Sequence, residues 1–223
     1  RFEQEYVGPV LFEEEAALEL FRSVLFGQLE GSPEVLPFET WLGDMGQGMF
    51  SPSGGSGARL GRRVLPSGWR VVDDPLSQPG EMGSFTHDAE GTPAEAVELV
   101  QDGIVRALVM SRIPRTDQAS NGHARGALGR RLEGRMSQVK ITPGAVLGSR
   151  RLHRKAIRAS KAYGRDYVLV VRRFQEDAVR ELDNAAPRVW REEQDTVVLS
   201  LPVEVIRRYA DGREEVIRGA AFS

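Results

Sequence analysis

Apolar residues recur at helical spacing in two parts of the chain. The first begins with three glutamates and then carries apolar side chains on one face, at Ala17, Leu20, Phe21, Val24 and Leu25. The second carries Leu152, Ala156, Ala159 and Tyr163 and ends before Gly164. Acidic residues in a first turn and a glycine after a last turn are typical helix ends. The pattern therefore predicts helices over about 13–29 and 149–163.

Strands are predicted where β-branched and other apolar residues cluster between turn signals. Asp102-Gly103 and Asp211-Gly212 supply the positive φ angles that tight hairpin turns demand. The run at 167–171 is almost wholly apolar, which is typical of a strand buried on both faces. The expected strands are 69–73, 96–100, 104–110, 167–171, 203–209 and 214–218. Two hairpins and two main helices predict an α+β, β-rich fold with mostly antiparallel sheets.

Composition limits the classes of protein that fit this pattern. The chain has 223 residues, is 40% hydrophobic and 28% charged, and carries a net charge of −2. This length suits one large domain or two small ones, with enough residues to bury a core. The absence of cysteine excludes disulfides and thiolate metal sites, and no apolar run approaches the ~20 residues of a membrane span. A cytoplasmic location without membrane contact is expected.

Two segments depart from this average composition. Residues 31–66 are rich in glycine, proline and serine and are predicted to form a long loop. Residues 125–158 hold eight arginines and two lysines against the single acid Glu133, a local charge of +9. Such a block can neutralise nucleic-acid phosphates or dock an acidic partner, although charge runs are commonly solvated surface.

No complete catalytic motif appears in the sequence. The three histidines, His87, His123 and His153, are far apart and lack the spacing that places two imidazoles on one helical face. His87-Asp88 has the composition of an acid/base pair, but adjacent polar residues in a loop more commonly form a turn. Neither a nucleophile elbow nor a phosphate-binding glycine motif is present.

The most unusual stretch follows the strand predicted to end at 110. It combines turn formers with hydrogen-bonding side chains at Asn121, His123 and Arg125. Binding residues concentrate on loops that leave a rigid sheet, although Asn121-Gly122 also suits a simple turn.

Five motifs in order resemble the C-terminal domain of the TldD/PmbA (TldE) metallopeptidase family, once called modulators of DNA gyrase. They are residues 6–12, 58–64, 71–75, 98–105 and 120–125. The similarity is good over 6–125 and loose over 167–219. The resemblance implies proteolysis of unfolded or small peptides by a dimer of related subunits, of which one binds zinc.

In the metal-binding subunit of that family, ligands come from a His-Glu-x-x-x-His helix and a cysteine. Neither occurs in this sequence. The chain therefore resembles a single C-terminal domain, residues 1–223, of a larger protein. That protein resembles the non-metal-binding TldE/PmbA type, or a divergent paralogue whose metal-binding helix lies in a missing N-terminal portion. We expect no catalytic residue, metal ligand or cofactor within this chain, with zinc coming from a partner subunit or a missing N-terminal domain. Whether the chain counts as an enzyme in its own right stays open.

Three functions remain open at this point. The first is a scaffold and substrate-channel wall whose peptide contacts are Asn121, His123 and Arg125, with a homologous TldD-like subunit or the chain's own N-terminal domain as partner. The second is a nucleic-acid or gyrase-binding module acting through residues 125–158. The third is a structural partner without substrate contact.

Overall fold

The computed structural model describes residues 5–31, 60–112, 118–126, 132–175, 199 and 201–222. Most of the predicted loop at 31–66 lies outside these ranges. Contacts between Cα atoms divide the chain into two compact units. We name them by their place in the sequence: the outer unit contains the two ends of the chain (Arg1–Val24 and Leu147–Ser223), and the inner unit contains the middle (Leu25–Val146). The expectation of a single domain over 1–223 stays a prediction.

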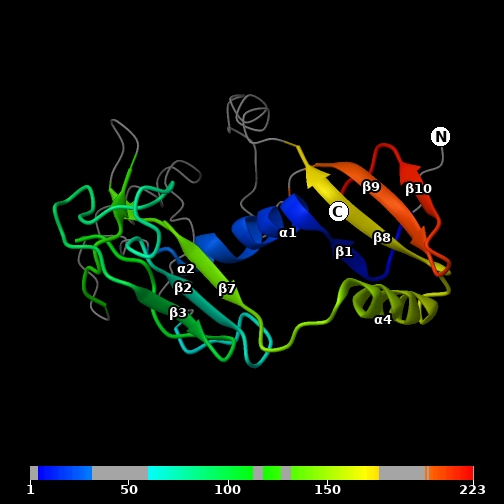
Figure 1. The fold of residues 1–223 in the computed structure, drawn as a ribbon, viewed down its shortest axis with the longest axis horizontal. Helices are drawn as coiled ribbons and strands as arrows, with labels where there is room; N and C mark the ends of the chain where they lie inside the picture. The colour runs from blue at the N-terminus through cyan, green and yellow to red at the C-terminus, as the bar shows by residue number, and fades with distance from the viewer. Residues whose placement is uncertain are drawn as a thin grey trace, which may run out of the picture. The chain divides into compact units, whose positions relative to one another are not determined.

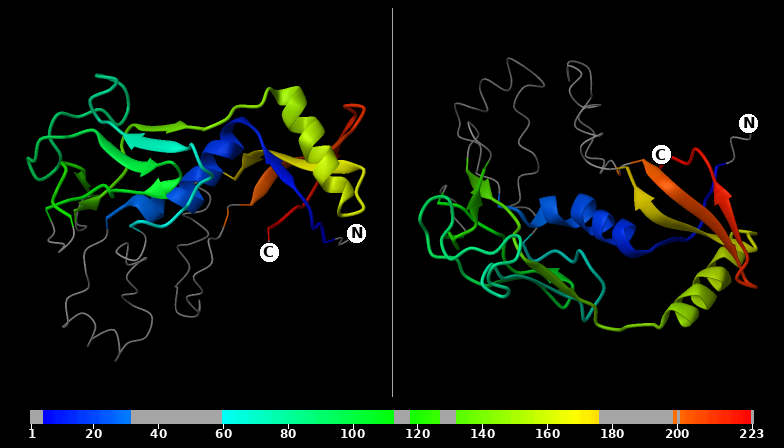
Figure 2. Two further views of the ribbon diagram at one scale, coloured as in Figure 1. Left: turned by 90° about the horizontal axis from the view of Figure 1, so that it is seen from below. Right: turned by 45° about the horizontal axis from the view of Figure 1, so that its top comes forward.

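A four-stranded sheet forms the body of the outer unit (Figures 1 and 2). Its strand order is β1-β8-β9-β10, in which β1 runs parallel to β8 and the other two pairs are antiparallel. The strands are β1 (Val10–Phe12), β8 (Tyr167–Phe174), β9 (Pro202–Tyr209) and β10 (Glu214–Ile217). The β9–β10 pair is the hairpin predicted across Asp211-Gly212.

The residues of β8 pack against two separate apolar clusters. Val168 and Val170 pack with Ala156 and Ile157 of helix α4 (Ser149–Lys161). The next residue, Val171, belongs to a different cluster, with Ala16, Phe174 and Val205. Because side chains alternate between the faces of a strand, this central strand has buried residues on both faces, as its apolar sequence predicts.

The predicted N-terminal helix forms, with an irregularity in its middle. It consists of α1 (Glu14–Phe21), a π-helical segment (Arg22–Phe26) and α2 (Gly27–Leu29). Ala16, Leu25 and Leu29 are its buried side chains. The spacing of apolar residues thus predicts the helix but not the wider turn within it.

A second four-stranded sheet, order β4-β3-β2-β7, forms the centre of the inner unit, and all its pairs are antiparallel. The strands are β2 (Arg70–Asp73), β3 (Val97–Gln101), β4 (Ile104–Val105) and β7 (Val139–Thr142). A two-stranded ladder joins β5 (Ala124–Arg125) to β6 (Glu133–Gly134). Both sheets together confirm the α+β, β-rich and mostly antiparallel fold class.

The Asp102-Gly103 hairpin is present, but its second strand is shorter than predicted. Asp102 and Gly103 have φ angles of 51° and 76°, as a tight turn requires. The strand ends at Val105 because the N–H groups of Arg106 and Ala107 both donate to the Leu99 carbonyl. The prediction of one strand over 104–110 was therefore wrong.

Residues 108–110 are nevertheless fully buried, because they pair elsewhere. Val109 donates to the carbonyl of Leu29 (3.0 Å) and accepts from the amide of Gly31 (2.8 Å). A Cβ at Gly134 would lie 2.0 Å from the carbonyl oxygen of Val109, so the chain passes there without room for a side chain.

Among the described residues, no helix is long and apolar enough to cross a bilayer.

Four charged side chains connect the strands of the outer unit. The guanidinium of Arg208 donates to both carboxylate oxygens of Glu13, and Arg172 donates to Glu13 and, through two hydrogen bonds, to Glu214. Hydrogen bonding from Arg208 is the main cause that lowers the pKa of Glu13, with a smaller contribution from Arg172. The network links the start of α1 to β8, β9 and β10.

Substitution Glu13→Gln is expected to lower the free energy of unfolding by about 0.5 to 1 kcal/mol at pH 7, as an exposed charge network allows. Because the folded-state pKa of Glu13 is lowered, its contribution is complete above the ordinary value of 4.5 and is lost as pH falls through the folded-state pKa. Urea unfolding from pH 7 to pH 3 should show the two proteins converging at acid pH. Glu5→Gln, at an exposed carboxylate, is the control, and a constant difference at all pH values would contradict the prediction.

Candidate functional site

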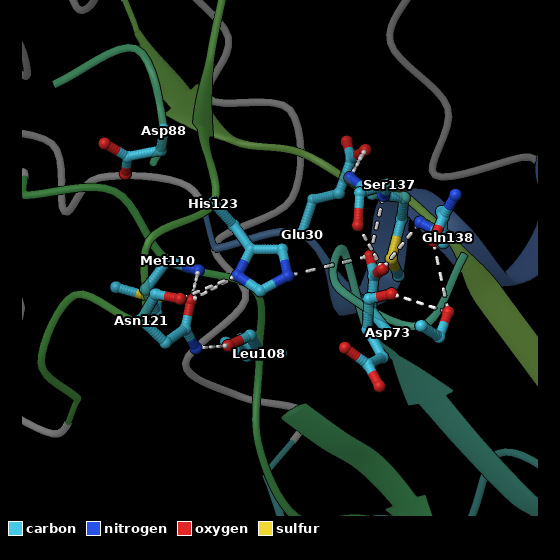
Figure 3. A network of polar contacts seen from close by, with 12 residues as sticks. Glu30, Asp73, Asp88, Leu108, Met110, Asn121, His123, Ser137 and Gln138 are labelled. Carbon is cyan, nitrogen blue, oxygen red and sulfur yellow. Dashed lines mark hydrogen bonds and ion pairs between the residues drawn. The ribbon is translucent and has the colours of Figure 1, made fainter. Parts of the chain in front are cut away.

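The candidate site in the inner unit is a buried polar network around His123 (Figure 3). Asp73, the last residue of β2, is completely buried, and its carboxylate accepts hydrogen bonds from the Ser137 amide (2.7 Å), the Ser137 hydroxyl and the Gln138 amide (2.8 Å). These donors lie directly before β7. The carboxylate therefore fixes the backbone where β7 begins beside the end of β2.

Asn121 holds the segment that leaves the hairpin. Its side-chain oxygen accepts from the amide of Met110 (2.7 Å), and its side-chain nitrogen donates to the carbonyl of Leu108 (2.8 Å). One amide side chain thus satisfies two buried backbone groups that have no strand partner at these positions. Asn121 acts here as a substitute for a neighbouring strand.

His123 is completely buried and lies between Asn121 and Asp73. Its Nδ1 is 2.9 Å from the main-chain carbonyl oxygen of Asn121. Because a carbonyl oxygen can only accept a hydrogen bond, Nδ1 carries a proton. Its Nε2 is 4.0 Å from Oδ2 of Asp73 and has no hydrogen-bond partner within the described part of the chain. The rings of His123 and Phe85 are nearly perpendicular, with centroids 6.1 Å apart.

Asp88 fixes the backbone on the other side of His123. Its Oδ1 accepts from the amides of Glu90 and Thr92, and its Oδ2 accepts from the amide of Ala124 (3.0 Å). His87 is exposed and contacts Thr86 instead. Asp88 therefore builds a turn. This agrees with the interpretation of His87-Asp88 as turn residues and not with an acid/base pair.

Arg125 lies on β5, two residues beyond His123, and its side chain is partly exposed. Its guanidinium carbon lies 4.0 Å from the centroid of the Phe85 ring, a cation–π arrangement. Phe85 thus contacts both His123 and Arg125. Asn121 contacts His123 and the main chain of Leu108 and Met110 instead, and of the three residues singled out from the sequence only His123 lies near Asp73.

Glu30 completes the network beside β6. Its carboxylate accepts from Arg135 (2.8 Å) and from the amide of Met136 (3.3 Å), and Arg135 also pairs with Glu133. Burial raises the pKa of Glu30, against the opposing effect of Arg135. Sequence reasoning did not single out Glu30, Asp73 or Phe85. The signal for Asp73 was its position two residues after Val71, on the same buried face of β2.

This donor set does not fit a zinc ion. Tetrahedral zinc needs three or four ligands at about 2.0 to 2.3 Å. His123 and Asp73 provide two groups, and the oxygens of Asp73 are already used by backbone and hydroxyl donors. Among the described residues, no cluster of three or more His, Asp or Glu side chains could hold a metal.

The residues of the arginine-rich segment 125–158 are divided between the two units. Arg125 stacks on Phe85 and Arg135 is paired with two glutamates, whereas Arg150 to Arg158 belong to α4 of the outer unit. Arg130 and Arg131 lie outside the described residues.

The fold and the site define a β-rich α+β domain with a buried polar network at the end of its central strand. A family model described as the PmbA/TldA metallopeptidase C-terminal domain matches residues 4–154. Because the match covers more than half of the chain, the chain belongs to this family, which confirms the resemblance noted in the sequence.

The chain is also similar to individual known proteins. A protein of Methanothermobacter thermautotrophicus named "Metalloprotease" is 33% identical over 88 residues, which cover 39% of this chain and 19% of that protein. A modulator of a DNA gyrase from Thermotoga maritima, solved by crystallography, superposes with a TM-score of 0.52 at 14% identity, covering 95% of this chain and 39% of that one. TldE from Thermococcus kodakarensis gives a TM-score of 0.48 at 17% identity, covering 75% and 33%. The chain thus spans well under half of each relative's length.

We predict that Asn121→Ala lowers the free energy of unfolding by about 2 kcal/mol or more, because it leaves a buried amide and a buried carbonyl without partners. Urea unfolding measures the loss. The neighbouring Ser120→Ala, which removes one long contact to the Gly122 amide (3.4 Å), is the control and should change stability by at most about 0.5 kcal/mol. Equal effects of the two substitutions would refute the anchoring role of Asn121.

Proposed function

We propose that this chain is the C-terminal domain of a TldD/PmbA-type metallopeptidase that cleaves unfolded or small peptides. The observation that most supports the proposal is the family match over residues 4–154, which includes every residue of the buried network. The relative named as a metalloprotease supports the same activity class. Within the assembly, the chain acts as scaffold and substrate-channel wall. A homologous TldD-like subunit or the chain's own N-terminal domain supplies the zinc.

The inner unit offers an edge suited to an extended peptide. Strand β7 is at the end of the sheet order, and within the described residues only β2 pairs with it. An extended peptide that adds to such an edge gains main-chain hydrogen bonds that do not depend on its sequence. This mode of binding suits a peptidase that accepts many peptides.

The three candidate residues take different parts in this proposal. Arg125 is partly exposed and can meet a peptide carbonyl or carboxylate directly. Asn121 and His123 are positioning residues, since their side chains hold buried backbone. Their action on substrate passes through the segment that carries Arg125.

Substitution Arg125→Ala in the full-length, metal-loaded assembly is expected to raise KM for peptide cleavage about tenfold, with kcat nearly unchanged, because a charged hydrogen bond to substrate is lost. Arg125→Lys keeps the charge without the planar guanidinium and should rescue part of the loss. Arg106→Ala, at an exposed arginine of the same unit, is the control.

Two results would count against the proposal at different levels. An unchanged KM for Arg125→Ala would remove Arg125 from the substrate path while leaving the peptidase assignment intact. No peptide cleavage by the metal-loaded wild-type assembly would refute the peptidase function itself.

A further inference from the structure

Helix α4 of the outer unit, labelled in Figure 1, carries two kinds of side chain on its two faces. Its buried side chains, Ala156, Ile157 and Ser160, lie on the face that contributes to the sheet's apolar core. The helix contains no acidic residue. Its exposed positions include six basic residues: Arg150, Arg151, Arg154, Lys155, Arg158 and Lys161.

These six residues form one continuous surface, which we call the basic face of α4. At about 100° per residue, they project over an arc of about 140°, roughly opposite the buried positions. Leu152, which is 43% exposed, lies beside this arc rather than within it. The basic face therefore contains no apolar or aromatic residue.

The charges of the basic face are not neutralised within the described part of the chain. None of the six side chains takes part in an ion pair, a hydrogen bond or a stacking contact there. Arg172 and Arg208 of the same unit, by contrast, are both paired with glutamates. Holding six cations on about four turns of helix costs repulsion that a polyanion would relieve.

We propose that the basic face of α4 binds the phosphate backbone of double-stranded nucleic acid. The helix is about 20 Å long, a length over which a duplex presents about twelve phosphates. The core of a protein–protein interface is depleted of charge and enriched in aromatic residues, whereas nucleic-acid interfaces are strongly positive. The basic face of α4 is strongly positive and has no aromatic residue, so it matches the composition of a nucleic-acid interface.

The same composition predicts how the duplex is recognised. Without aromatic side chains on the face, bases of a single strand have no stacking platform. Without asparagine or glutamine on it, adenine edges have no bidentate partner. Binding should therefore tolerate any sequence, prefer a duplex and depend strongly on salt.

Fluorescence anisotropy of the full-length protein with a labelled duplex of about 25 base pairs, at salt from about 50 to 200 mM, tests the proposal. Four to six phosphate contacts predict a slope of log K against log salt between about −3.5 and −5.5. The triple substitution R151Q/R154Q/R158Q should weaken binding at least tenfold at low salt and reduce the slope by about 3. Glutamine keeps the helix, since its propensity is close to that of arginine.

The triple substitution R62Q/R106Q/R218Q is the matched control, because it removes the same charge at three exposed arginines that are not part of α4. It should retain the wild-type slope. No duplex binding at low salt, or equal losses in the two triple variants, would overturn the proposal. Displacement of the duplex by a poly-glutamate peptide at equal charge concentration would also overturn the proposal, because it would point to an acidic protein as the partner.

Discussion

Three polar side chains of the inner unit bind main-chain groups that no neighbouring strand pairs. The carboxylate of Asp73 receives the amides where β7 begins, that of Asp88 receives the amides of Glu90, Thr92 and Ala124, and Asn121 serves Met110 and Leu108. Short strands cannot satisfy their own ends, and an unsatisfied buried amide costs about 1 to 3 kcal/mol. Polar side chains therefore do the work that longer strands perform in a regular sheet. His123 packs between two of these side chains, Asn121 and Asp73.

The sequence predicts elements that are defined by their own periodicity. Helix α4, strand β8 and the β9–β10 hairpin follow from apolar spacing and from Asp-Gly turns, and each is present. The second strand of the Asp102-Gly103 hairpin is shorter than predicted, and Val109 pairs with Leu29 and Gly31 rather than with β3. Burial alone does not reveal which segment a buried residue contacts.

In the candidate site, too, local features of the sequence are predictable and long-range contacts are not. Asn121, His123 and Arg125 were found because they stand close together in the sequence, in a loop after a strand. Asp73 reaches Ser137 across 64 residues, and Asp88 reaches Ala124 across 36. A single sequence does not show which residues this far apart in the chain come into contact in the fold. An aspartate at a buried position of a strand is the local sign that a distant donor must exist.

Gly134 shows how tightly this architecture restricts its sequence. With the Val109 carbonyl 2.0 Å from where a Cβ would stand, even alanine would have to push two backbones apart. A homologue with a larger residue here must therefore hold its 108–110 segment at a greater distance. Such a homologue would also need a different anchor for that segment, so the residue types at 121 and 134 should change together across the family.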